Sequence, residues 1–263
     1  MRLFRYAITA WLALLALAAP AAADDFSHLA FSDGFNGTTA SIAQKWNVAD
    51  YCNFGPGPPN GASQACFTND AQHATESDGL LSLRATYQPK CGADESFTCW
   101  LSAQLSSKTT VTPPLKLVAR VWVAPGVGMW SGGAWMGNGC MEVDSLEQLG
   151  RTAIGNTQSV HRWGCTGSHA SVSKFADLDV PLADAFHTYA AKVYADRVNY
   201  SIDGKRTNQI RDSELGGVGS WRMLRPMTFK TSLNVGTCWG WAGCPDYTDT
   251  QIEYVDWYRV YTP

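Results

Sequence analysis

The sequence predicts an all-β fold, a curved antiparallel β-sandwich whose concave face forms a cleft. Short segments that alternate apolar and polar residues, rich in β-branched and aromatic side chains, recur between turn residues. Beyond the N-terminal segment, no helical period of useful length is present. Many short strands joined by glycine and proline turns are typical of a sandwich or a barrel. A sandwich of this size can curve and offer one concave face.

Six segments show the strand pattern most clearly. The first follows the turn Ser77-Asp78-Gly79, and the fourth runs into Asp203-Gly204, a pair typical of a tight turn. In the last segment, ten residues long, successive side chains would point to opposite faces of a strand and form two sets. The expected strands run from Leu80 to Ala85, Leu115 to Val123, Tyr189 to Ala195, Val198 to Ile202, Thr228 to Val235 and Ile252 to Tyr261.

The N-terminal segment, residues 1–23, has the order of a secretory signal peptide. Two arginines lead, an apolar run from Ala7 to Ala19 follows, and small residues surround Ala21 and Ala23. The apolar run is shorter than the roughly 20 residues that a bilayer span needs. We therefore expect cleavage after Ala23 and a secreted protein, extracellular or attached to the cell wall, with no membrane span.

The remaining residues, 24–263, are expected to form one domain. Their formal net charge is −5, because the leader holds two of the 20 basic residues and none of the 23 acidic ones. The sequence lacks the kind of basic patch that would indicate nucleic acid or an anionic membrane as a partner. We expect a monomer.

Eight cysteines follow the leader, and an oxidising compartment favours their pairing as disulfides. The short spacings of Cys91 with Cys99 and of Cys238 with Cys244 make these the favoured local pairs. Cys52 with Cys66 and Cys140 with Cys165 are one choice among several, because spacing does not determine connectivity. Zinc binding is disfavoured, since no C-x₂-C pair is present.

A cluster of acidic residues lies between two glycines, in the segment Gly139 to Gly150. Glu142 and Asp144 share one face of a regular strand, whereas Glu147 falls on the other face. A β-bulge between Asp144 and Glu147 would bring all three acids to one face, and bulges are common beside active sites.

Such a cluster suits glycoside hydrolysis, which needs one carboxylate as nucleophile and one protonated carboxyl as acid. Asp144, placed between the two glutamates, would hydrogen-bond the nucleophile and help to separate their pKa values. The alternative interpretation is a solvated acidic strand face, which short motifs of this kind often are.

The chain resembles glycoside hydrolase family 16, the laminarinase-like enzymes, on a series of ordered landmarks. The family signature E-x-D-x-x-E, its bulged form, stands here as Glu142-Val-Asp144-Ser-Leu-Glu147. Flanking segments resemble the family's other landmarks: Phe31 to Phe35, Asp78 to Leu83, Ala119 to Met136, Val160 to Gly164, Phe186 to Tyr189, Val198 to Gly204 and Tyr254 to Tyr261. The resemblance therefore implies the family's fold, a curved β-jelly roll.

The resemblance implies a role for each acid. Glu142 is the nucleophile, Asp144 its assisting acid and Glu147 the general acid that later acts as base. His161 is placed like the family's histidine beside the acid/base, although a core histidine bonded to backbone is an equal alternative.

Several further residues are candidates for substrate binding, because pyranose faces stack on aromatic rings. Arg120 could bond a sugar hydroxyl, with a structural ion pair as an equal alternative. The aromatic candidates are Trp130, Trp135, Trp163, Trp239 and Trp241, with Trp130, Trp135 and Trp239 favoured.

The resemblance implies a secreted, retaining endo-hydrolase of a β-1,3-glucan or β-1,3(4)-glucan by double displacement. The alternatives are hydrolysis of a β-galactan, transglycosylation on the same fold, or a non-catalytic glucan-binding protein. Retention of both Glu142 and Glu147 argues against mere binding. No cofactor is required by this chemistry, and a structural calcium ion on the convex face is an option that no motif places. Met141 and Ser145 depart from the residues usual in the family, so the identity of the sugar stays open.

Overall fold

The computed structural model describes residues 25–53, 63–91, 95–163, 165, 169–216 and 223–263. The expected signal peptide, residues 1–23, lies outside the described residues. In the described ranges strands predominate, with one short α-helix, α1 (Thr39–Lys45), and two 3₁₀ helices, Leu182–Asp184 and Asp212–Leu215. None of these helices is long and apolar enough to cross a membrane.

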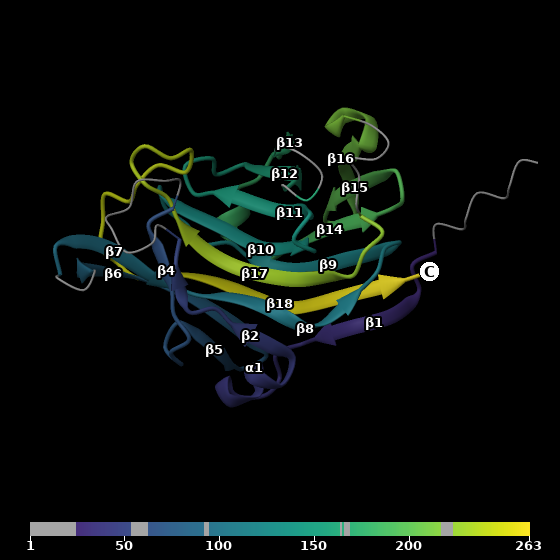
Figure 1. The fold of residues 1–263 in the computed structure, drawn as a ribbon. Coiled ribbons are helices and arrows are strands. Elements are labelled where there is room, and N and C mark those ends of the chain that lie inside the picture. The colour runs from purple at the N-terminus through teal and green to yellow at the C-terminus, as the bar shows by residue number, and fades with distance from the viewer. Residues whose placement is uncertain (1–24, 54–62, 92–94, 164, 166–168, 217–222) are drawn as a thin grey trace, which may run out of the picture.

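The strands lie in two layers (Figure 1), as the sequence predicts. They are β1 (His28–Asp33), β2 (Trp46–Val48), β3 (Tyr51–Cys52), β4 (Ala65–Phe67), β5 (Ala74–Ser77), β6 (Leu80–Cys91), β7 (Phe97–Ser102), β8 (Gln104–Val111), β9 (Leu115–Trp122), β10 (Met129–Gly137), β11 (Met141–Leu149), β12 (Gly155–Arg162), β13 (Ala170–Asp177), β14 (His187–Val193), β15 (Arg197–Ile202), β16 (Lys205–Arg211), β17 (Met227–Val235) and β18 (Gln251–Thr262).

One layer has the strand order β16-β15-β14-β9-β18-β6-β7-β4-β3, with β1 beside β18 and β5 beside β6. The other has the order β13-β12-β11-β10-β17-β8-β2. Among the described residues, every strand pair is antiparallel except β4 with β7. All six segments expected from the sequence are strands, and the fold is confirmed as an antiparallel β-sandwich.

The core lies between the two layers and follows from the period of two along each strand. On β9, Leu115, Leu117, Ala119 and Val121 are fully buried, whereas the residues between them are partly exposed. The turn after β15 uses Asp203 and Gly204 with φ of 48° and 76°. Positive φ at both central residues matches the right-handed twist of a hairpin, so the expected tight turn is confirmed.

All four disulfides join the pairs named from the sequence: Cys52–Cys66, Cys91–Cys99, Cys140–Cys165 and Cys238–Cys244. Cys52 and Cys66 are direct partners across β3 and β4, which places this crosslink at the edge of the sheet. Cys140 stands immediately before β11, the strand that carries the acidic cluster. The third disulfide therefore anchors the start of that strand.

Candidate active site

The acidic cluster lies on β11, near the middle of the seven-stranded sheet, and the predicted β-bulge is present. Asp144 pairs with Ser159 of β12, and Glu147 pairs with Thr157. Three steps along β11 therefore match two steps along β12, which is the extra residue that a bulge inserts. Glu142, Asp144 and Glu147 line the same cavity, as the parity argument requires.

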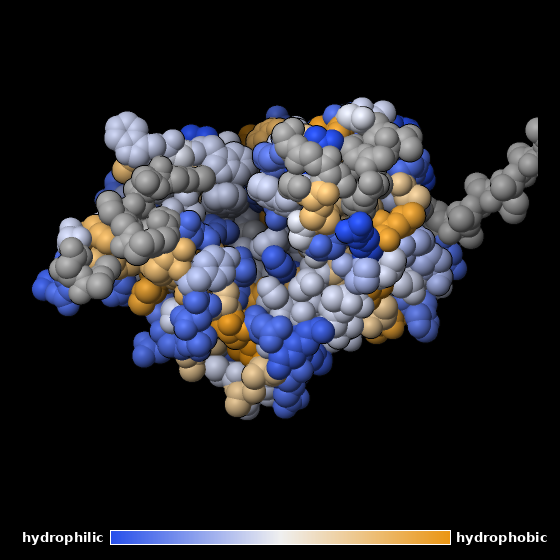
Figure 2. Space-filling view, in the orientation of Figure 1, coloured by the Kyte–Doolittle hydropathy of each residue, from blue (hydrophilic) through white to orange (hydrophobic). Residues whose placement is uncertain are grey.

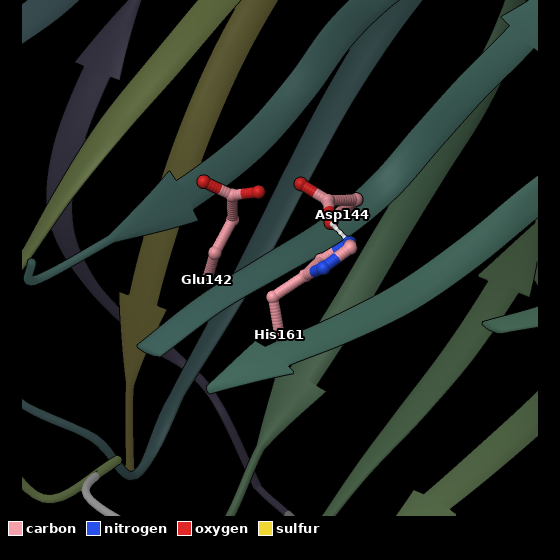
Figure 3. A group of neighbouring side chains, drawn as sticks. All are labelled: Glu142, Asp144 and His161. Carbon is pink, nitrogen blue, oxygen red and sulfur yellow. Dashed lines mark ion pairs between the residues drawn. The ribbon is translucent and has the colours of Figure 1, made fainter. Parts of the chain in front are cut away.

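Side chains from two neighbouring strands meet at the cluster. Figure 3 shows Glu142 and Asp144 on one face of β11, with the ring of His161 reaching toward Asp144 from β12. His161 Nε2 lies 3.4 Å from Asp144 Oδ2. Potential ligand atoms of Glu142, Asp144 and His161 all lie within 4.8 Å of one another.

Glu147 has the properties of a group that exchanges a proton near neutrality. Burial raises the pKa of its carboxyl to about 7, and the charge of Glu142 adds to this. Hydrogen bonds to the carboxylate favour the ionised form and oppose the rise. The Ser159 hydroxyl donates one of 2.9 Å to Glu147 Oε2, and the Trp130 indole donates another.

Glu142 has a partner that Glu147 lacks, the ammonium group of Lys230 on β17. Burial raises the pKa of Glu142, but the charge of Lys230 and a hydrogen bond from Trp163 act in the opposite direction. Lys230 Nζ lies 4.1 Å from the ring centroid of Trp135, so a cation–π contact holds it at this position. Lys230 therefore favours an ionised Glu142.

Asp144 is fully buried between the two glutamates. Its burial and the charges of Glu147 and Glu142 raise its pKa well above the ordinary value, against the opposing charge of Lys230, and so favour the protonated carboxyl. Burial, together with His169, lowers the pKa of His161 to about 4, so its imidazole is uncharged at neutral pH. Asp144 and His161 therefore contribute an uncharged hydrogen-bond donor and an uncharged imidazole to the site.

A second bulge, in β10, shapes the floor beside the carboxylates. Gly132 pairs with Ser232 and Trp135 pairs with Lys230, so three steps on β10 match two on β17. Trp130 and Trp135 therefore face the same cleft despite their odd spacing. Gly132 permits the close approach of β17, since an added Cβ would stand 2.9 Å from the Ser232 hydroxyl oxygen.

The cleft comprises two cavities that meet at Glu142. One, of about 340 Å³, extends over β10, β17 and β8 and is lined by Trp130 and Trp135. The other, of about 310 Å³, is lined by Trp163 and Lys230. Figure 2 shows a hollow in this face of the molecule.

The remaining aromatic candidates take different positions. Trp163 stacks on His169 with ring centroids 4.3 Å apart, and this stack continues to His161. Trp241 packs edge-on against Trp130. Trp239 is 91% exposed, beyond β17 in the loop closed by Cys238–Cys244, and lines neither cavity.

The structure does not bring Arg120 to the cleft. Arg120 alternates with the buried residues of β9, so it projects from the outer face of the other sheet. There its guanidinium pairs with Asp256 and lies over the ring of Phe186. The expectation that Arg120 binds sugar is therefore corrected in favour of the structural ion pair.

Two polar residues of the site were not singled out from the sequence, Ser159 and Lys230. Lys230 belongs to a strand that was expected, and the alternation of Thr228, Lys230, Ser232 and Asn234 is the signal that could have found it. Ser159 carries no such signal, because its role depends on register with β11.

Of the described residues, Glu142, Asp144 and His161 form the group that could hold a metal ion. Metal ligation needs a deprotonated carboxylate, so a cation there would compete with the proton that burial favours on Asp144. The cluster suits proton transfer and nucleophilic attack better than metal binding.

Comparison with known proteins identifies a family and a fold. The sequence model of "Glycosyl hydrolases family 16" matches residues 61–259. No curated protein matches the chain in sequence. Among solved structures, the catalytic domain of an endo-1,3-beta-glucanase (laminarinase) from Thermotoga petrophila RKU-1 superposes with a TM-score of 0.75 at 24% identity, covering 89% of this chain and 97% of that one.

Two further structures agree with this likeness. The endo-beta-1,3-glucanase from Pyrococcus furiosus has a TM-score of 0.74 at 23% identity, covering 89% of this chain and 94% of that chain. LamAcat from Zobellia galactanivorans has a TM-score of 0.74 at 21% identity, covering 90% and 98%. At these identities the likeness shows a shared fold.

Proposed function

The chain belongs to the glycosyl hydrolases of family 16, and from this premise we propose that it is a retaining endo-hydrolase of a β-1,3-glucan or β-1,3(4)-glucan. The observation that carries the proposal is the asymmetry of the two glutamates on one bulged strand. Burial raises the pKa of both carboxyls, to about 7 at Glu147, whereas at Glu142 the charge of Lys230 opposes the rise and favours the ionised form. A pair with separated pKa values is what an acid and a nucleophile need.

In the first step the Glu142 carboxylate attacks the anomeric carbon as the glycosidic C–O bond breaks. Glu147 gives its proton to the departing oxygen, and a covalent glycosyl–enzyme forms. In the second step the Glu147 carboxylate takes a proton from water, whose oxygen displaces Glu142 from the anomeric carbon. Two inversions leave the configuration retained, and Glu147 ends protonated again.

Asp144 supports this cycle through its protonated carboxyl, which can donate a hydrogen bond toward Glu142 when that group leaves the anomeric carbon. His161 lies 3.4 Å from Asp144 and, being neutral, adds no charge beside that carboxyl. Trp130 and Trp135 supply the apolar walls of the cleft. Because Lys230 covers one face of Trp135, Trp130 is the better candidate for stacking on a sugar.

The choice of a β-1,3-linked glucan rests on the enzymes whose fold this chain shares, which are described as endo-1,3-beta-glucanases. We further propose that the protein is secreted after removal of residues 1–23, and four disulfides fit an extracellular protein.

The test is incubation with laminarin, mixed-linkage β-1,3/1,4-glucan and β-galactan, followed by mass and linkage analysis of the products. We expect internal cleavage of a β-1,3-linked glucan, with the β-anomer appearing first in the NMR spectrum. An α-anomer formed first would reject double displacement. Cleavage of galactan alone would identify a β-galactan as the substrate. Transfer to an added acceptor sugar would indicate a transglycosylase. Binding without new reducing ends would leave a non-catalytic protein.

A further inference from the structure

The concave face continues beyond the carboxylates onto β12 and β13. Both strand pairs are antiparallel, and β12 with β13 has no break in register. The register therefore aligns each acid with two residues in a row across the sheet. The rows are Glu142 with His161 and Ser171, Asp144 with Ser159 and Ser173, and Glu147 with Thr157 and Phe175.

Phe175 faces the cleft side of the sheet. The Ser173 hydroxyl lies 2.9 Å from the Ser159 hydroxyl, which itself donates to Glu147, so Ser173 points toward the catalytic face. Phe175 is two residues further along the same regular strand and shares that face. Lys174, between them, points the other way and donates to the Gln209 carbonyl oxygen at 2.7 Å.

The ring of Phe175 lies against the backbone of β12 at Gly155. A Cβ at Gly155 would stand 1.8 Å from Phe175 Cζ, so the ring occupies the space that any other side chain would fill. Phe175 is nevertheless 51% exposed. A half-exposed aromatic ring on the cleft side of a sheet is a platform that can stack on the C–H face of a pyranose.

We propose that Phe175 binds a sugar unit of the polymer outside the two cavities, on the β13 side of the scissile bond. This inference rests on the proposed function. Phe175 stands two strands from Glu147 in the same row, or about 10 Å at the usual spacing between strands. A chain that crosses the strands from the cavity at Trp130 and past Glu147 reaches Phe175 next.

The surface between Glu147 and Phe175 indicates the chemistry of that sugar. The row positions on β12 and β13 carry the hydroxyls of Thr157, Ser159, Ser171 and Ser173, together with the neutral ring of His161. None of these five positions carries a lysine or an arginine. Phe175 itself also borders a third cavity, of about 560 Å³, that is lined by Lys205 and Arg206. The hydroxyls of the row can exchange hydrogen bonds with sugar hydroxyls, so the surface between Glu147 and Phe175 suits the hydroxyl groups of a glycan.

The experiment compares Phe175→Ala with Phe175→Tyr, which keeps the ring, and with Leu29→Ala, a control that trims another exposed apolar side chain on β1 of the other sheet. The substrates are β-1,3-gluco-oligosaccharides of increasing length, labelled at the reducing end, or β-galacto-oligosaccharides if the wild type cleaves those. The readouts are kcat/KM at each length and the bond that is cut.

For chains long enough to reach the platform, Phe175→Ala should lower kcat/KM by roughly three- to tenfold, the size of one aromatic contact. It should also move the preferred cleavage site, leave shorter chains unaffected and leave Tm unchanged, whereas Phe175→Tyr and Leu29→Ala should behave as wild type. If Phe175→Ala has the cleavage pattern and kcat/KM of the wild type at every length, the platform is rejected but the proposed function is not. Loss at all lengths alike would assign Phe175 to stability and also reject the platform. A wild-type enzyme that cleaves none of the oligosaccharides would reject the proposed function and the platform together.

Discussion

The hydroxyl of Ser159 donates a 2.9 Å hydrogen bond to the Glu147 carboxylate across the β11–β12 pair. The same hydroxyl lies 2.9 Å from that of Ser173, so it is oriented from both sides. A donor to the ionised form holds the pKa of Glu147 below the value that burial alone would set.

Replacing Ser159 with alanine should therefore raise the pKa of Glu147 from its value of about 7. We expect the alkaline limb of the kcat/KM profile to move to higher pH by about one unit, the worth of a hydrogen bond to a charged group. The measurement is a pH profile beside Ser171→Ala, a serine on the same face that lies in the Glu142 row. An alkaline limb that stays in place would show that Glu147 is not the group titrating there.

Lys230 acts on the other glutamate, and Lys230→Met should raise the pKa of Glu142. The lost positive charge no longer favours the carboxylate, so the acidic limb of kcat/KM should move to higher pH and the active range should narrow. Lys116→Met is the matched control, since that lysine lies over the Tyr261 ring on the other sheet. A limb that moves to lower pH would contradict the assignment of Glu142 as the ionised nucleophile.

The two glutamates should differ in their response to the leaving group. Glu147→Gln should lower kcat on a polysaccharide by about 10²- to 10⁴-fold, the usual contribution of general acid catalysis. With an aryl glycoside whose leaving group needs no proton, it should still form the glycosyl–enzyme and release a burst of phenol. Glu142→Gln should show no burst with either substrate, because the nucleophile is gone.

A surface pair provides the control for both variants. Glu95→Gln removes a carboxyl that pairs with Lys90 on the exposed edge and should keep wild-type turnover. All three proteins should bind the polysaccharide and melt at similar temperatures. Wild-type turnover by either catalytic variant would reject the double displacement through this pair.

Glu253 is a fully buried carboxyl outside the cleft, on β18 beneath Gly133 of the bulged β10. Burial raises its pKa to about 8, against the opposing effect of the Ser131 hydroxyl. In the unfolded chain the group ionises near 4.5. Between these two values the folded state holds a proton that the unfolded state has released. The free energy of unfolding should therefore fall by up to about 1.4 kcal/mol for each pH unit across this window.

Glu253→Gln should remove that slope. The variant should match the wild type near pH 4.5 and be the more stable protein near pH 8, as judged by denaturant unfolding at a series of pH values. Glu95→Gln again serves as the control, because its carboxyl is exposed. Parallel stability curves for wild type and Glu253→Gln would show that Glu253 does not titrate in this window.

Much of the fold was predictable because its signals are local. Six strands, the Asp203-Gly204 turn and the layered architecture follow from alternation and turn residues within a few positions of each other. The bulge in β11 was predictable for a related reason. An odd spacing between Asp144 and Glu147 fits a single cleft face only if one extra residue is inserted.

The pairing of strands distant in the chain decided the rest. The sequence alone determined the acids, their order on one strand and the need for a bulge between them. Only the tertiary structure brought Lys230 beside Glu142 and Ser159 beside Glu147, because register between β11, β12 and β17 is set by packing across the whole sandwich. It also placed Arg120 on the outer face, since the inward side of β9 was already taken by Leu117, Ala119 and Val121. A period of two shows which residues share a face, but the face that becomes the cleft depends on how the two sheets close on each other.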